Sequence, residues 1–217
     1  IKVPKTHSIA ISGNTLSEEI DGEYKNYKVS ATNIRDVAWA VSDEFILKEE
    51  NLDNIKIKVY SIKDNEALIN KSLEYGKKSL EIFNKTYGKY PYDTYSIVIT
   101  EFPSGMEYPG LVLISADYFN EDLLKVLETV IVHETAHQWW YAVVGSNSIK
   151  EPWLDEGLAT YSEVIYTDEL KGEDSAKNYY DVNIKLGYEY MIQYLEGNTR
   201  VDKHLSEFNS WDDYGVL

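Results

Sequence analysis

The sequence predicts an α+β protein in which strands come first and helices follow. Residues 54–62, "NIKIKVYSI", alternate apolar and polar side chains, which is the period of a half-buried strand. From about residue 65 onwards the apolar residues recur at mixed spacings of three, four and seven, as they do along a helix. Strands followed by helices are typical of α+β folds. We therefore place a domain boundary near residue 64, at the end of a β-sheet module.

Further strands are expected on both sides of this boundary. "YKVSATNI" and "AWAVSDEFIL" show the strand pattern less cleanly within residues 1–64. After a helix that "YGKYPYD" ends, "TYSIVITEF" and "LVLIS" read as strands joined by the Gly/Pro turn "PSGMEYPG". Two strands joined in this way suggest the edge of a sheet.

Three helices are expected in the later part of the chain. The first runs from Glu121 to about Val144, capped by Asn120 and followed by Gly145. The second begins near Pro152 and ends before Gly172, and the third covers residues 173–197.

Composition excludes several classes of function. There are 37 acidic and 21 basic residues, and the formal charge of −16 argues against binding to nucleic acid or to an anionic membrane surface. No apolar run approaches the roughly 18 residues that would cross a bilayer. Cysteine is absent, which excludes disulfides and thiolate chemistry and leaves the compartment open. Any metal must be held by nitrogen and oxygen ligands.

The stretch "HETAH" carries the clearest chemical signal. On a helix, His133 and His137 stand one turn apart on the same face, so both imidazoles can reach one cation. A zinc ion held by three protein groups activates water, and Glu134 can then act as general base. The three fixed letters of HExxH arise by chance in about a few per cent of chains of this length. A third ligand therefore decides whether the motif is part of a zinc site. Glu156 can supply it, because 18 intervening residues allow a second helix to return antiparallel.

Two other acidic residues lie near the candidate ligand. For Asp155 and Glu163 we expect a supporting or a solvent-facing position rather than a bond to the metal.

Three motifs resemble a known family, the zinc aminopeptidases of the membrane alanyl aminopeptidase type, which are gluzincin metallopeptidases. "HQWW" resembles the HQW that follows the family's HExxH, and "WLDEGLATY" resembles its WLNEGFA segment. Upstream, "SGMEYPG" resembles its GxMEN exopeptidase motif. The order of the motifs agrees, and the resemblance runs from near residue 24 to the end of the chain.

This resemblance implies a thermolysin-like catalytic domain over residues 65–217, preceded by the last strands of a β-sheet domain in residues 1–64. It implies one zinc ion bound by His133, His137 and Glu156, with Glu134 as base.

The resemblance also implies how a substrate binds. Glu107 would hold the free α-amino group of a peptide, so that single residues are removed from the N-terminus. The backbone around Gly105 and Met106 would form the sheet edge along which the peptide lies. The expected partners are therefore peptides with a free N-terminus.

Two features depart from the family pattern. Tyr108 stands where the family has Asn. The family's oxyanion-stabilising tyrosine is expected close to or beyond Leu217, with Tyr214 the nearest candidate, so we expect the catalytic domain to be truncated on its C-terminal side. Two alternatives stay open: a zinc endopeptidase of the thermolysin type, and a peptide-binding fragment with weak catalysis.

Overall fold

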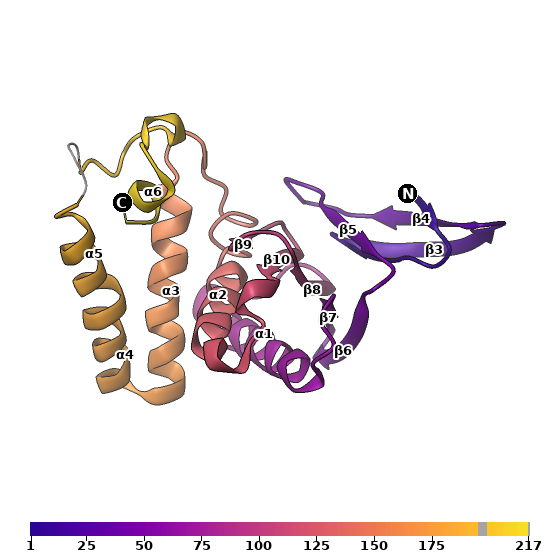
Figure 1. Cartoon of the computed structure of the whole chain (residues 1–217), viewed down its shortest axis with the longest axis horizontal. Helices are drawn as coiled ribbons and strands as arrows, with labels where there is room; N and C mark the ends of the chain where they lie inside the picture. The colour runs from indigo at the N-terminus through magenta and orange to yellow at the C-terminus, as the bar shows by residue number, and fades with distance from the viewer. Residues whose placement is uncertain (195–198, 217) are drawn as a thin grey trace. The chain divides into compact units, whose positions relative to one another are not determined.

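The computed structural model describes residues 1–194 and 199–216. The chain forms two compact units, Ile1–Gln138 and Trp139–Leu217, which are described separately below. The strands belong to the first unit, and the second is helical (Figure 1). The predicted α+β class is thus confirmed. Among the described residues, no helix combines the length and the apolar character needed to cross a membrane.

The first strands of the chain form two small antiparallel sheets. β1 (Lys2–Pro4) and β3 (Asn14–Asp21) lie on either side of β4 (Tyr24–Ser30). β2 (Ser8–Ile11) pairs with β5 (Trp39–Ser42). One buried apolar cluster of this region consists of Val3, Ile9, Ile11 and Tyr27.

A five-stranded sheet forms the centre of the first unit. Its order is β6 (Ile46–Leu52), β7 (Ile55–Ser61), β8 (Thr94–Thr100), β10 (Leu111–Ser115) and β9 (Gly105–Met106). β7, β8 and β10 run parallel, whereas β6 and β9 are antiparallel edge strands. The middle of β8 is continuously buried, as is usual for a parallel strand inside a sheet. The segment predicted to be a turn at a sheet edge therefore contains the edge strand itself.

α1 (Glu66–Tyr87) begins where the sequence predicted a change from strand to helix. The side chain of Asn65 caps it by accepting a hydrogen bond from the amide of Leu68 at 3.2 Å. A glycine inside the helix, Gly76, lets it approach the sheet, because a β-carbon there would lie 3.5 Å from the Tyr95 ring and closer still to Ile97.

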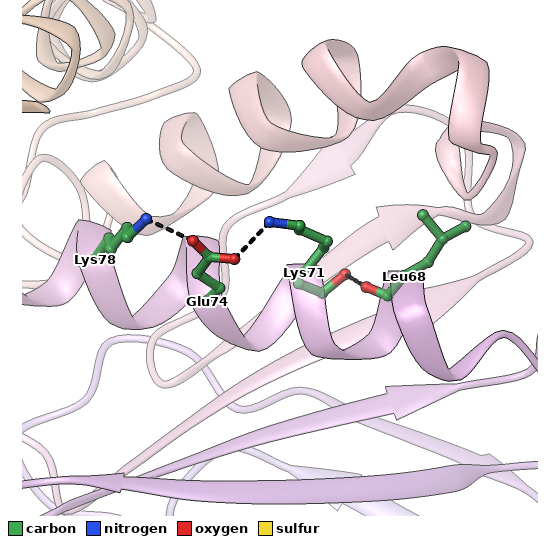
Figure 2. Close-up of polar contacts among 5 residues, drawn as sticks. Leu68, Lys71, Glu74 and Lys78 are labelled. Atoms are coloured by element: carbon green, nitrogen blue, oxygen red, sulfur yellow. Dashed lines mark hydrogen bonds and ion pairs between the residues drawn. The ribbon is translucent and has the colours of Figure 1, made fainter. Parts of the chain in front are cut away.

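The exposed side of α1 carries a short row of charges. Figure 2 shows Glu74 between Lys71 and Lys78, one helical turn away on either side. Hydrogen bonds from Lys71, at 2.7 Å, and from Lys78 lower the pKa of the Glu74 carboxyl. Such exposed pairs on a helix add only a few tenths of a kcal/mol each, about 0.3–0.5. The position of α1 is thus set by its buried side, where it packs against α2.

The helix that carries HETAH is shorter than predicted. It starts as a 3-10 turn, η2 (Glu121–Leu123), and continues as α2 (Leu124–Ala136), so the prediction that it extends to Val144 is wrong. The regular bonding ends because the amide of Gln138 bonds to the carbonyl of Thr135, three residues back, at 3.0 Å. The predicted cap is confirmed, since the Asn120 side chain accepts from the amide of Asp122.

The second unit is built from helices. α3 (Trp153–Lys171) matches the prediction, and α4 (Glu173–Tyr179) packs against it. The chain then continues through a π-helical segment, Tyr180–Lys185, into α5 (Leu186–Met191). The third predicted helix is thus confirmed up to residue 191, and its last positions, 195–197, lie outside the described residues.

The domain boundary near residue 64 stays a prediction. Two strands before it, β6 and β7, belong to the same sheet as β8, and the compact units divide after Gln138. The alternation in residues 54–62 identified a strand correctly. It did not indicate that this strand has a parallel partner 38 residues further along the chain, as the pairing of Lys56 with Thr94 and of Ile57 with Tyr95 shows.

Candidate active site

The two predicted histidine ligands face each other at the end of α2. His133 lies in the last turn of the helix, and the amide of His137 bonds to the His133 carbonyl at 3.3 Å. Their Nε2 atoms are 3.2 Å apart, and the ring planes are inclined by 73°. His137 is buried and His133 half-buried.

This spacing fits a shared zinc ion. Two imidazole nitrogens bound to one tetrahedral zinc ion at about 2.0–2.1 Å lie roughly 3.3 Å apart. The observed 3.2 Å between the Nε2 atoms matches that value. Neutral imidazole is also a ligand that zinc commonly takes. The pair has the spacing and the chemistry to supply two ligands of a zinc site.

A buried hydrogen-bond chain holds this end of α2 against the sheet. The hydroxyl of Thr135 donates to the carbonyl of Ile131 at 2.6 Å, so its single hydrogen is used there. Tyr95, on β8, must then donate its own hydrogen to Thr135 Oγ1, also at 2.6 Å. Complete burial raises the pKa of the Tyr95 hydroxyl, which keeps this donor protonated. Between the histidines, the helix is thus anchored to a central strand.

Glu134, the predicted base, is buried against the edge strand β9. A β-carbon added to Gly105 would lie only 2.6 Å from Glu134 Cδ and 2.9 Å from its Cγ. Such contacts are closer than van der Waals packing allows, so a larger residue at position 105 would require Glu134 or the strand to move. Sequence analysis placed Gly105 in the expected sheet edge along which a peptide lies, and the structure adds that this glycine packs against Glu134.

The predicted substrate-binding residues follow one another at this edge. Met106 pairs with Leu113 of β10, so the two-residue strand β9 is held by its neighbour on one side and ends the sheet on the other. The next residue, Glu107, is 9% exposed. A carboxylate in such a place is partly desolvated, which strengthens its attraction for a cation. The departure at Tyr108 falls on the turn that follows.

Gln138, to which sequence analysis gave no role, is hydrogen-bonded to this turn. Its Oε1 accepts from the amide of Gly110 at 2.8 Å, and its Nε2 donates to the carbonyl of Tyr108 at 3.2 Å. Gln138 is fully buried. A signal was present in the sequence: a single uncharged polar residue stands between the second histidine and two tryptophans, in "HQWW".

In the second unit, Glu156 lies in the first turn of α3. Its Oε1 accepts a hydrogen bond from the hydroxyl of Tyr214 at 2.7 Å. Tyr214 is part of α6 (Trp211–Val216), and its ring stands edge-on to Phe208 with centroids 5.3 Å apart. A buried ion pair between Lys203 and Asp213, at 3.3 Å, fixes the same segment. Tyr214, the candidate for oxyanion stabilisation, thus contacts the carboxylate of the predicted ligand.

The two neighbouring acidic residues are both buried and hydrogen-bonded within the second unit. Asp155 Oδ2 accepts from the hydroxyls of Ser148, at 2.5 Å, and Ser146, at 3.2 Å. Glu163 accepts from the hydroxyl of Tyr179 at 2.6 Å. Of the two positions expected for them, these contacts favour the supporting one over the solvent-facing one.

An α+β fold in which a helix ends on an HExxH sequence with its two imidazoles paired is typical of the HExxH metallopeptidases. The profile of the Peptidase family M1 domain matches residues 71–210, and the chain belongs to this family. The resemblance noted in the sequence is thereby confirmed.

Relatives and solved structures agree with this assignment. The chain is 31% identical over 168 residues to Aminopeptidase 2 of Candida albicans, covering 70% of this chain and 18% of that protein. It is 30% identical over 185 residues to Aminopeptidase M1 of Arabidopsis thaliana, covering 78% and 21%. It spans about a fifth of the length of these curated relatives.

A solved structure supports the fold. The crystal structure of the M1 zinc metallopeptidase from Deinococcus radiodurans matches with a TM-score of 0.67 at 19% identity, covering 91% of this chain and 44% of that one.

Proposed function

We propose that this chain carries the zinc-binding and water-activating residues of an aminopeptidase that hydrolyses the N-terminal peptide bond of peptides. The observation that carries the proposal is the 3.2 Å spacing of the His133 and His137 Nε2 atoms, beside a glutamate buried against the sheet edge. His133, His137 and Glu156 would hold one zinc ion, in agreement with the HExxH spacing and the family. The curated relatives named above are aminopeptidases.

Zinc, when bound, supplies a Lewis acid that polarises the scissile carbonyl and makes water more acidic. The chain's own contribution to the chemistry centres on Glu134. Its carboxylate would accept a proton from the attacking water and return it to the nitrogen of the leaving amine as the C–N bond breaks. Proton transfer of this kind requires a base held in one place. The close packing of Glu134 on Gly105 restricts the carboxylate in this way.

Glu107 would select peptides with a free N-terminus. Glu107 as a whole is only 9% exposed, so an ammonium group that reaches its carboxylate would form a charge-assisted hydrogen bond largely away from bulk water. That bond would fix how far a peptide enters the site and would therefore place the first peptide bond at the reacting position. The free side of β9 would pair with the extended backbone of the same peptide.

Metal content and substrate choice together test the proposal. We expect the purified protein to hold one zinc ion per chain, and Glu156→Gln and His133→Gln to lose it, with Glu74→Gln as a remote control. Hydrolysis or binding of a short peptide should depend on a free amine and disappear on N-acetylation. If both ligand variants kept the metal, the zinc site would be refuted. Equal hydrolysis of the acetylated peptide would instead favour an endopeptidase. If the protein bound zinc and peptide but hydrolysed nothing, it would be a peptide-binding fragment.

A further inference from the structure

We infer that Gln138 is a positioning residue. Its hydrogen bonds hold the turn after Glu107 against the HETAH segment and thereby fix the position of the Glu107 carboxylate, which receives the substrate amine. The inference rests on the proposed function, since it concerns the same site. It starts from the two hydrogen bonds between the Gln138 amide and the backbone of Tyr108 and Gly110.

The partners fix the orientation of the Gln138 amide. An amide N–H such as that of Gly110 can only donate, and a carbonyl such as that of Tyr108 can only accept. Oε1 must therefore face Gly110 and Nε2 must face Tyr108, at 2.8 and 3.2 Å. A carboxylate would satisfy the first contact and repel the second. A hydrocarbon side chain would satisfy neither.

The turn needs such a partner. The amide of Leu111 closes it by bonding to the Tyr108 carbonyl at 3.0 Å, and Pro109 has no amide hydrogen to contribute. Gly110 is buried and has a positive φ of 74°, a conformation that favours glycine. Its amide would lack a partner if Gln138 did not accept its hydrogen. A buried amide left without an acceptor is destabilising, so this bond strongly influences which turn forms.

Glu107 lies between two attachments to the same short segment. On its N-terminal side, Gly105 packs against Glu134. On its C-terminal side, Tyr108 and Gly110 are bound by Gln138. Residues 134–138 therefore hold both ends of the stretch that contains Glu107. A shift of about 1 Å in a substrate-positioning group can reduce a rate a hundredfold, so loss of one attachment should be measurable.

The test uses Gln138→Leu, which removes both hydrogen bonds at similar volume, and Gln193→Leu on the chain's other glutamine as a matched control. The probes are L-leucinamide, its N-acetyl derivative and zinc itself. We expect Gln138→Leu to bind leucinamide at least about tenfold more weakly, with zinc affinity within about threefold of the unaltered protein. Amide exchange at Gly110 should be faster, a change that needs no activity to be seen.

The outcomes separate this inference from the proposed function. If the unaltered protein binds leucinamide and Gln138→Leu binds it equally well, the inference is overturned and the proposed function stands. If the unaltered protein does not bind leucinamide, both fail. Should Gln138→Leu not fold, Gln138→Glu decides, because it keeps the acceptor for Gly110. We expect that variant to bind leucinamide more weakly than the unaltered protein, and unchanged affinity would overturn the inference.

Discussion

The carboxyl group of Glu134 on α2 occupies the position that a side chain at Gly105 of β9 would take, since a β-carbon there would lie 2.6 Å from Glu134 Cδ. The predicted base and the predicted substrate-binding edge are thus in contact. A change at position 105 should therefore affect folding and catalysis together.

Gly105→Ala tests this contact. The added methyl group would lie 2.6 Å from Glu134 Cδ, so the side chain or the strand must move. We expect a loss of about 1–3 kcal/mol in the free energy of unfolding, measured by urea denaturation. Gly187→Ala is the control, because nothing lies within 4 Å of the new methyl group there and alanine favours the helix. Equal stability of the two variants would contradict the contact.

Tyr214→Phe tests the hydrogen bond to Glu156. The substitution removes a 2.7 Å contact and keeps the ring beside Phe208. Groups that orient a metal ligand typically change metal affinity by about 10–100-fold, so we expect zinc to bind at least tenfold more weakly in competition with a chelator. Tyr194→Phe, on an exposed tyrosine, should leave the affinity unchanged. Unaltered zinc affinity in Tyr214→Phe would show that this bond does not orient the carboxylate.

Asp155→Ala and Asp155→Asn should differ. The buried carboxylate accepts from two serine hydroxyls, and alanine leaves both without this acceptor, which costs about 1–3 kcal/mol of stability. Asparagine retains one oxygen and is the residue of the family's WLNEGFA segment, so we expect a smaller loss. Thermal unfolding would measure both, with Asp168→Ala on an exposed aspartate as control. The same loss in both Asp155 variants would contradict a hydrogen-bonding role.

Stability should fall in alkaline solution. Burial raises the pKa of Tyr60 to about 12, above the value of 10.0 expected in the unfolded chain. The unfolded state therefore releases this proton first, so the contribution is intact below pH 10 and is lost as pH rises towards 12. Between pH 9 and pH 11 we expect Tyr60 to account for about 1.4 kcal/mol of the decrease. Burial also raises the pKa of Tyr90 and Tyr95, which adds to the effect.

Urea denaturation of Tyr60→Phe at these two pH values measures that share. The variant should lose less stability than the unaltered protein on going from pH 9 to pH 11. Tyr161→Phe, on an exposed tyrosine, is the control. If Tyr60→Phe and the unaltered protein lost the same stability between pH 9 and pH 11, the pKa of Tyr60 would be the same in the folded and the unfolded states.

Local signals in the sequence predicted local structure well. Asn65 and Asn120 were recognisable as caps, and the alternation in residues 54–62 identified β7, because these patterns depend on neighbouring residues. The end of α2 was wrong by eight residues, since it depends on the switch to a three-residue backbone bond at Gln138. No local pattern indicates such a switch.

In the candidate site, too, contacts within one helix could be predicted and contacts between distant segments could not. The spacing of His133 and His137 predicted that their imidazoles meet, and the structure places the Nε2 atoms 3.2 Å apart. The contacts of Glu134 with Gly105 and of Gln138 with Gly110 join segments about 30 residues apart. They depend on how α2 lies against the sheet, which one sequence read by itself does not contain.

The shortness of β9 has a consequence for association between molecules. An exposed sheet edge invites other extended chains to add to it, and long edges promote aggregation. β9 offers only Gly105 and Met106, and Pro103 and Pro109 stand close on either side. Proline lacks the amide hydrogen that would extend the ladder. The edge is therefore too short for two copies of the protein to pair along it, while the proposed peptide would need only this short stretch.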